Sequence, residues 1–224
     1  ERVNKSIKTI GDCSQMEITR VFQTRDELIP WLINTFNLQH GIEVGVRDGC
    51  FSKVILDNTH KNFRLLGVDI YKTIALENFM KEYIDRFACV FNYSHHIAEK
   101  IPDDSIELIH IDAGHTYYDV KLDLESWWPK VKVGGFFTGD DYCICSTPNE
   151  GEYGIVQAVE EWAAVNNLSD KIYLTQAGYV NINERRTLAN FRGMQVEDNL
   201  RKMYEPHRPY HENAHVPTWL IRKC

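Results

Sequence analysis

The chain contains no apolar run that could cross a bilayer. Its uninterrupted apolar segments are only a handful of residues long, whereas a spanning helix needs about 20. The first residues, ERVNKSIKTIGDC, also contain no apolar core of a signal peptide. We therefore expect a cytoplasmic protein that makes no contact with membranes.

Cysteine pairs of the CxxC type are also absent. The six cysteines are scattered along the chain, which is more typical of reduced thiols than of a disulfide framework. Only Cys143 and Cys145 stand close together. A zinc site that joined them to Asp140 would need a second Cys or His pair at matching spacing, and the sequence has none.

Basic side chains are fewer than acidic ones. The 224 residues include 32 acidic and 25 basic side chains, for a formal net charge of −7, and no strong basic patch interrupts this balance. The net negative charge repels polyanions, so we expect no nucleic-acid partner. The length and the 43% hydrophobic content suit one sizeable core, so residues 1–224 are predicted to form a single domain, and an oligomer is compatible with this composition.

Two hydrophobic periodicities alternate along the chain. Segments with helical spacing separate apolar runs of strand length, which occur at Gly41–Val46, Leu65–Ile70, Ile106–Ile111 and Gly135–Thr138. Helices are predicted from Asp26 to about Phe36, from about Val120 to Trp128 before Pro129, and from Ile155 to about Val165. This order predicts a doubly wound α/β fold with a mostly parallel sheet.

The C-terminal part of the sequence, from about residue 171, shows less periodicity. Lys171–Thr175 and Thr218–Arg222 resemble strands, and Tyr179–Ile182 competes for one of these assignments. Residues 183–215, rich in Arg, His and Tyr, are predicted to be an insertion, which could be either a substrate lid or an exposed loop.

The turn after the first predicted strand has the features of a nucleotide-binding loop. Glu43, Gly45 and Gly49 give an acid followed by two spaced glycines, and Asp69 ends the next strand. Ligands of such sheets bind outside the carboxyl ends of the strands, and a carboxylate there can accept both hydroxyls of a ribose. A carboxylate at Glu43 would oppose a pyrophosphate, so S-adenosylmethionine, which has no phosphate, is favoured over NAD.

A second group of polar residues follows two further strands. Asp112 and His115 come after one strand, and Asp140 and Asp141 come after the next. Any one such Asp could be an ordinary turn or cap residue. Three carboxylates at one edge repel each other unless a cation compensates them, so we predict a divalent metal site that prefers Mg²⁺, with Mn²⁺ or Ca²⁺ as alternatives.

The run IDAGHTYYDVKLDLESWW, with VKVGGFF and GDDY after it, resembles the class I S-adenosylmethionine-dependent methyltransferases of the macrocin-type, or sugar O-methyltransferase, group. The resemblance implies a seven-stranded Rossmann-like sheet and metal ligands at Asp112, Asp140 and Asp141, with Asp112 also near the cofactor. It further implies that the adenine lies near Asn92, Ser94 and His95. Related catechol-type enzymes have a lysine as the base three residues beyond the first ligand; this sequence departs from that pattern with His115, which we predict to be the base.

The predicted function is transfer of a methyl group from S-adenosylmethionine to a hydroxyl oxygen of a small molecule, with a sugar or glycan as the preferred acceptor. A catechol or other phenol is the alternative acceptor. A hydroxylase-like enzyme on the same scaffold would need two histidines and one carboxylate for iron, and a non-catalytic binding module would need a purely structural acid cluster. His110 and the Trp127–Trp128 pair are interpreted as core residues.

Overall fold

The computed structural model describes residues 22–143, 146–147, 151–175 and 216–224. The predicted insertion at 183–215 and the competing strand at 179–182 lie outside these residues. Whether residues 1–224 form a single domain therefore stays a prediction.

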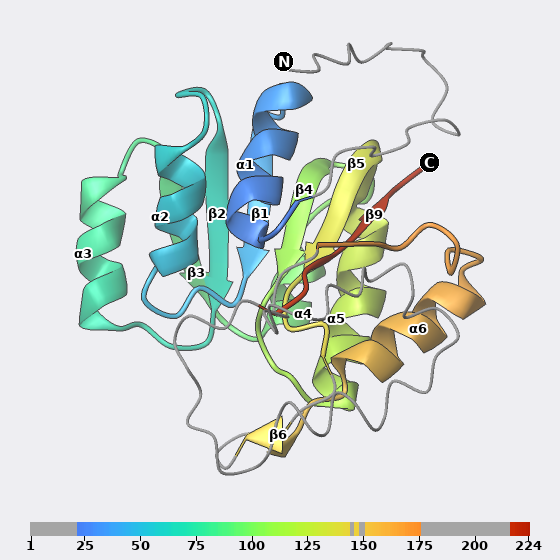
Figure 1. Ribbon diagram of the computed structural model, residues 1–224. Helices are drawn as coiled ribbons and strands as arrows, with labels where there is room; N and C mark the ends of the chain where they lie inside the picture. Colours follow the sequence, from blue (N-terminus) through green and yellow to red (C-terminus); the bar gives the residue numbers. More distant parts are fainter. Residues whose placement is uncertain (1–21, 144–145, 148–150, 176–215) are drawn as a thin grey trace, which may run out of the picture.

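A seven-stranded sheet forms the centre of the molecule (Figure 1), with the order β3-β2-β1-β4-β5-β9-β8. Its strands are β1 (His40–Val44), β2 (Arg64–Asp69), β3 (Phe87–Phe91), β4 (Ile106–Ile111), β5 (Val131–Gly139), β8 (Tyr173–Leu174) and β9 (Trp219–Arg222). The first five run parallel to one another, whereas β9 is antiparallel to both β5 and β8. The predicted fold class is confirmed.

Helices cover both faces of this sheet, and each face has its own hydrophobic core. On one face, β-strand side chains pack against α1 (Arg25–Thr35), α2 (Cys50–Asp57) and α3 (Ile74–Glu82). On the other, they pack against α4 (Ser94–Ala98), α5 (Tyr117–Trp127) and α6 (Ile155–Val165). A 3-10 turn (Trp128–Lys130) follows α5, and the short strands β6 (Ser146–Thr147) and β7 (Gly151–Glu152) form a separate pair.

Most predicted elements lie where the periodicity places them. β4 and α6 have the predicted bounds, and β5 starts at Val131 rather than Gly135. Trp127 is fully buried and Trp128 is partly buried against the same core. His110 is 1% exposed, with Nδ1 2.6 Å from the Thr138 hydroxyl, so these core interpretations are confirmed.

The cysteines depart from the expectation of reduced thiols at one position. Cys50, Cys89 and Cys143 are free, but Cys224 is disulfide-bonded. The expectation is therefore wrong for Cys224, because scattered spacing in sequence says little about which thiols the fold brings together. Among the helices of the described segments, none combines the length and apolar character that a bilayer crossing requires.

Candidate active site

The candidate residues meet at the carboxyl edge of the sheet. β4 lies between β1 and β5 with parallel register, so the loops after all three strands open on the same side. The Asp112 amide donates to the Val44 carbonyl (2.7 Å), and the Asp140 amide donates to the Ile111 carbonyl (3.0 Å). The backbone itself therefore fixes the spacing of these loops.

Gly45 is required by the close approach of two of these loops. Its φ is +89°, and a Cβ at this position would lie 2.0 Å from the Asp112 carbonyl oxygen. A larger residue would have to displace the Asp112 backbone. The glycine thus couples the predicted cofactor loop to the acidic group, a role that the sequence pattern did not indicate.

The Asp69 carboxylate holds the loop after β1 in place. One oxygen accepts hydrogen bonds from the Val46 and Arg47 amides (2.9 and 2.8 Å), and the other accepts one from the Tyr71 amide (2.8 Å). A carboxylate has about four acceptor positions, so one oxygen retains capacity for a further donor. This arrangement suits the predicted contact with a ribose hydroxyl at the edge of the sheet.

Glu43 lies beneath this loop rather than on its surface. Its side chain is 1% exposed and accepts a hydrogen bond from the Ser52 hydroxyl. Burial raises the pKa of Glu43 to about 8, while the Ser52 hydrogen bond opposes the rise. Gly49 caps α2 with a φ of +83°. The geometry gives Glu43 a supporting position under the loop, so its predicted contact with the cofactor remains a prediction.

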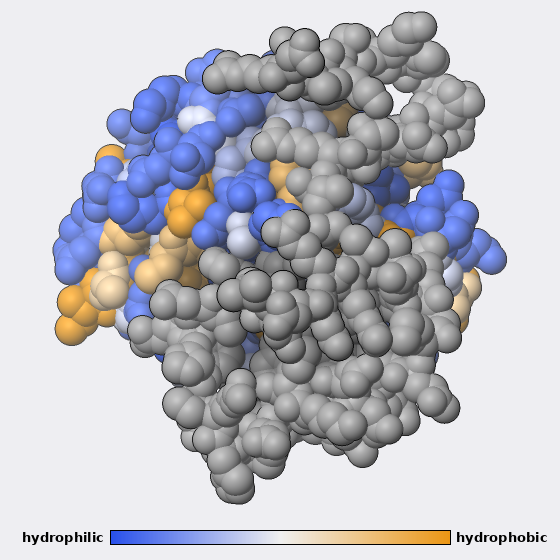
Figure 2. Space-filling model, in the orientation of Figure 1, coloured by the Kyte–Doolittle hydropathy of each residue, from blue (hydrophilic) through white to orange (hydrophobic). Residues whose placement is uncertain are grey.

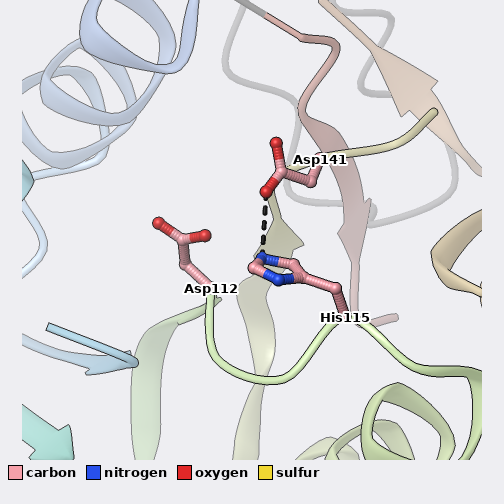
Figure 3. Close-up of side chains that lie close together, drawn as sticks. All are labelled: Asp112, His115 and Asp141. Atoms are coloured by element: carbon pink, nitrogen blue, oxygen red, sulfur yellow. Dashed lines mark ion pairs between the residues drawn. The ribbon is translucent and has the colours of Figure 1, made fainter. Parts of the chain in front are cut away.

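Three predicted side chains point toward one another at the edge (Figure 3): Asp112, His115 and Asp141. Each offers a donor atom, and these atoms all lie within 4.8 Å of one another. The His115 Nε2 atom is 3.0 Å from an Asp141 oxygen. The His115 ring also stacks on Tyr153, with 4.5 Å between ring centroids and an interplanar angle of 7°, so the imidazole has a defined orientation.

Asp140 faces a different partner from its neighbour Asp141. One Asp140 oxygen lies 2.7 Å from an Arg25 nitrogen, and the other accepts a hydrogen bond from the Thr218 hydroxyl (2.8 Å). The backbone of Asp141 is left-handed, with a φ of +53°. This uncommon conformation at a site of clustered polar groups directs the two consecutive carboxylates to separate contacts.

Arg25, at the start of α1, connects two of the acids. The same Arg25 nitrogen is 2.5 Å from an Asp112 oxygen, and the guanidinium lies 4.2 Å from the centre of the Phe51 ring. Burial raises the pKa of both Asp112 and Asp140, and the Arg25 charge opposes this rise. The ionised acids would therefore be stabilised by further positive charge.

The residues predicted to lie near the adenine differ in the contacts that they make. The Ser94 hydroxyl donates to Asp123 (2.5 Å) and accepts from the Trp127 indole nitrogen (2.6 Å), so it joins α4 to α5. The His95 ring packs against those of Tyr93 and His96. Ser94 therefore has a structural role in addition to any ligand contact.

Apolar side chains are exposed beside the predicted cofactor position. They lie at the ends of β2 and β3 and shortly after them. Figure 2 shows hydrophobic colour near the lower end of α3, as well as at other places on the described surface. The exposed residues of this group are Ile70, Tyr71, Ile74, Phe91 and Tyr93. Such a surface next to the sheet edge suits a planar apolar ligand.

The residues that the sequence reasoning missed are Arg25, Thr218 and Tyr153. Each lies outside the strand-end motifs that guided the predictions. For Arg25 a signal existed: a helix that leads into the first strand of a parallel sheet begins at the carboxyl edge, so its first residues lie beside the site.

Comparison with known proteins is consistent with this geometry. Residues 42–142 match a family described as a methyltransferase domain. A protein of Sinorhizobium fredii, described only as uncharacterized protein y4gI, is 26% identical over 155 residues, which cover 60% of this chain and 16% of that protein. The chain thus spans less than a fifth of that relative.

Solved structures share the fold at low sequence identity. The O-methyltransferase TomG of Streptomyces achromogenes, involved in tomaymycin synthesis and solved with S-adenosylmethionine, matches with a TM-score of 0.54 and 10% identity over 89% of this chain and 80% of its own. A Staphylococcus aureus protein provisionally named a caffeoyl-CoA O-methyltransferase matches with a TM-score of 0.51 and 17% identity, over 67% and 76% of the two chains.

A Clostridium thermocellum protein provisionally named an rRNA methylase has a TM-score of 0.57 and 11% identity, over 91% and 97% of the two chains. These neighbours differ in the acceptors that their names indicate, so they establish the fold and not the substrate. Residues 42–142 therefore carry the sequence pattern of a methyltransferase domain, on the Rossmann-like fold of solved methyltransferases.

Proposed function

We propose that the chain transfers a methyl group from S-adenosylmethionine to a hydroxyl oxygen, with the assistance of a divalent cation. The observation that carries the proposal is the juxtaposition, at one sheet edge, of the Gly45 loop held by Asp69 and the group of Asp112, His115 and Asp141. A methyl donor and an acceptor oxygen must meet within a few ångströms, and this edge brings the two sets of residues together.

The cofactor is proposed to lie across the loops after β1, β2 and β3. Asp69 would accept hydrogen bonds from the ribose hydroxyls, and the exposed apolar residues around Ile70 would contact the adenine. Gly45 and Asp112 would lie near the methionine end. The match of residues 42–142 to a methyltransferase domain supports this placement.

Substitution of Asp69 with alanine is expected to weaken binding of S-adenosylhomocysteine by about 10- to 100-fold, because the loss of one partner of buried hydroxyls costs about 1–3 kcal/mol. Isothermal titration calorimetry measures the change. Asp69→Asn keeps an oxygen for the loop amides and should have a smaller effect. The ribose contact is wrong if Asp69→Ala binds as tightly as the parent protein.

The donor atoms of Asp112, His115 and Asp141 lie close enough together to surround a divalent cation. Two carboxylates and one imidazole suit Mn²⁺ well, and the carboxylates suit Mg²⁺. If His115 is itself a ligand, its Nε2 atom and the Asp141 oxygen, 3.0 Å apart, have the separation of adjacent ligands of an octahedral ion with bonds of about 2.1 Å. A bound cation would lower the pKa of an acceptor hydroxyl and fix the position of its oxygen.

The proposed ligand group differs from the one that the sequence suggested. Asp140 has both carboxylate oxygens engaged, by Arg25 and Thr218, and the described donor group contains His115 in its place. We propose Asp112 and Asp141 as ligands, with His115 beside them as the base that takes the acceptor proton. A ligand role for the same Nε2 atom is the alternative, because one lone pair cannot serve both purposes.

The acceptor is proposed to be a sugar or glycan hydroxyl, a preference that rests on the resemblance to sugar O-methyltransferases. A catechol or other phenol is equally consistent with the matched structures. Assay of both acceptor classes with labelled S-adenosylmethionine decides between them. Within the described residues, the donor group has one histidine and two carboxylates, which does not match the two-histidine iron site of a hydroxylase.

A further inference from the structure

Arg25 lies between two acids of the site and is restrained on several sides. Its nitrogen contacts Asp112 at 2.5 Å and Asp140 at 2.7 Å, while the Phe51 ring packs against the guanidinium. Its side chain is only 25% exposed. An arginine held in this way keeps its charge and direction, because its guanidinium does not lose a proton in proteins.

The contacts of Arg25 divide the three carboxylates into two kinds. Each Asp140 oxygen has a partner, since Arg25 contacts one oxygen and Thr218 donates to the other. Asp141 contacts His115 instead. Asp112 has both kinds of contact. One of its oxygens contacts Arg25, and its carboxylate also contributes to the donor group with His115 and Asp141.

The charges of the site balance only when Arg25 is counted. Three carboxylates bring three negative charges, and Arg25 neutralises one of them. The remaining two match a divalent cation with a neutral imidazole. Without Arg25, a cation would meet three carboxylates, and Asp140 would be free to turn toward it.

We propose that Arg25 is a positioning residue that withholds Asp140 from the metal. The ligand group is thereby restricted to the side of the site formed by Asp112 and Asp141. This inference rests on the cation of the proposed function, and it assigns to an arginine in α1 the choice of which consecutive acid, Asp140 or Asp141, faces the metal.

The test is a set of Mn²⁺ titrations by calorimetry on the parent protein, Arg25→Gln, Asp140→Asn and the double variant. Arg25→Gln is expected to bind Mn²⁺ about tenfold more tightly or better, because it removes a nearby positive charge and releases a carboxylate. Asp140→Asn alone should change the affinity by less than about threefold. In the double variant most of the gain should disappear, since the released carboxylate is absent.

A purely structural role for Arg25 would not produce tighter binding that Asp140→Asn reverses. Unchanged or weaker Mn²⁺ binding by Arg25→Gln would overturn the inference while the metal proposal survived. If Arg25→Gln does not fold, as judged by thermal melting without metal, the comparison of Asp140→Asn with Asp141→Asn decides. Only Asp141→Asn should weaken Mn²⁺ binding, by about tenfold or more, and equal losses would overturn the inference.

The parent titration separates this inference from the proposed function. Binding of S-adenosylhomocysteine without any binding of Mn²⁺ would overturn both the role of Arg25 and the metal part of the proposal. The cofactor part would remain. Saturable Mn²⁺ binding by the parent with the expected pattern among the variants supports both.

Discussion

Removal of divalent cations with excess EDTA is expected to lower turnover on the order of 100-fold or more. A bound cation contributes several kcal/mol by stabilising the charge that develops on the acceptor oxygen, and the pKa values of Asp112 and Asp140 are already raised by burial, so the site gains from added positive charge. The measurement is the rate of S-adenosylhomocysteine release after chelation and after addition of Mn²⁺ or Mg²⁺. Either ion should restore turnover.

Cofactor affinity is the control for chelation. Binding of S-adenosylhomocysteine should change by less than about threefold in EDTA, because the ion is proposed to serve the acceptor rather than the cofactor. Undiminished turnover in excess EDTA would contradict the metal proposal. It would leave Arg25 and His115 as the partners that compensate the acids.

His115→Ala is expected to lower kcat by about 10²- to 10⁴-fold, the usual contribution of a general base. The imidazole contacts Asp141 at 3.0 Å and stacks on Tyr153, so it is held in a fixed direction beside the proposed acceptor position. Steady-state kinetics measure the effect, with cofactor affinity measured alongside. His40→Ala is the matched control, because His40 is exposed at the start of β1, the opposite edge of the sheet.

Metal affinity separates the two roles of His115. If His115 acts only as a base, His115→Ala should bind Mn²⁺ within about threefold of the parent affinity. If His115 is a metal ligand, the same variant should bind Mn²⁺ about tenfold more weakly or worse. Near-parental kcat in His115→Ala would place the base on another residue.

The fold could be predicted from periodicity because each strand of a parallel sheet is a buried apolar run. β4 is an example, with bounds equal to those of its apolar run, and the helix α6 has the bounds of its helical pattern. The run Phe87–Phe91, which forms β3, was harder to recognise, since β3 is at the edge of the sheet and has exposed residues at its second and last positions. An edge strand has less need of continuous apolar sequence.

The site was only partly predictable for a related reason. The rule that parallel strands end at one edge places Asp112, His115, Asp140 and Asp141 together, and the structure does so. It does not give the direction of consecutive side chains. The left-handed backbone of Asp141 separates it from Asp140, and Arg25 approaches from a helix that begins 87 residues before Asp112 in the sequence.

Glu43 shows a different limit of the sequence pattern. An acid at the end of the first strand is compatible both with a ligand contact and with a buried support for the loop. The structure has Glu43 1% exposed and bonded to Ser52 of α2, a position that the sequence pattern alone does not indicate.

The central claim, that this chain uses S-adenosylmethionine, is tested most directly by calorimetric titration of the parent protein with S-adenosylmethionine and, separately, with NAD. The loop after β1 has an acid before it and lacks the glycine spacing that a pyrophosphate needs. We expect saturable binding of S-adenosylmethionine at one site per chain and no saturable binding of NAD. Binding of NAD without binding of S-adenosylmethionine would contradict the claim.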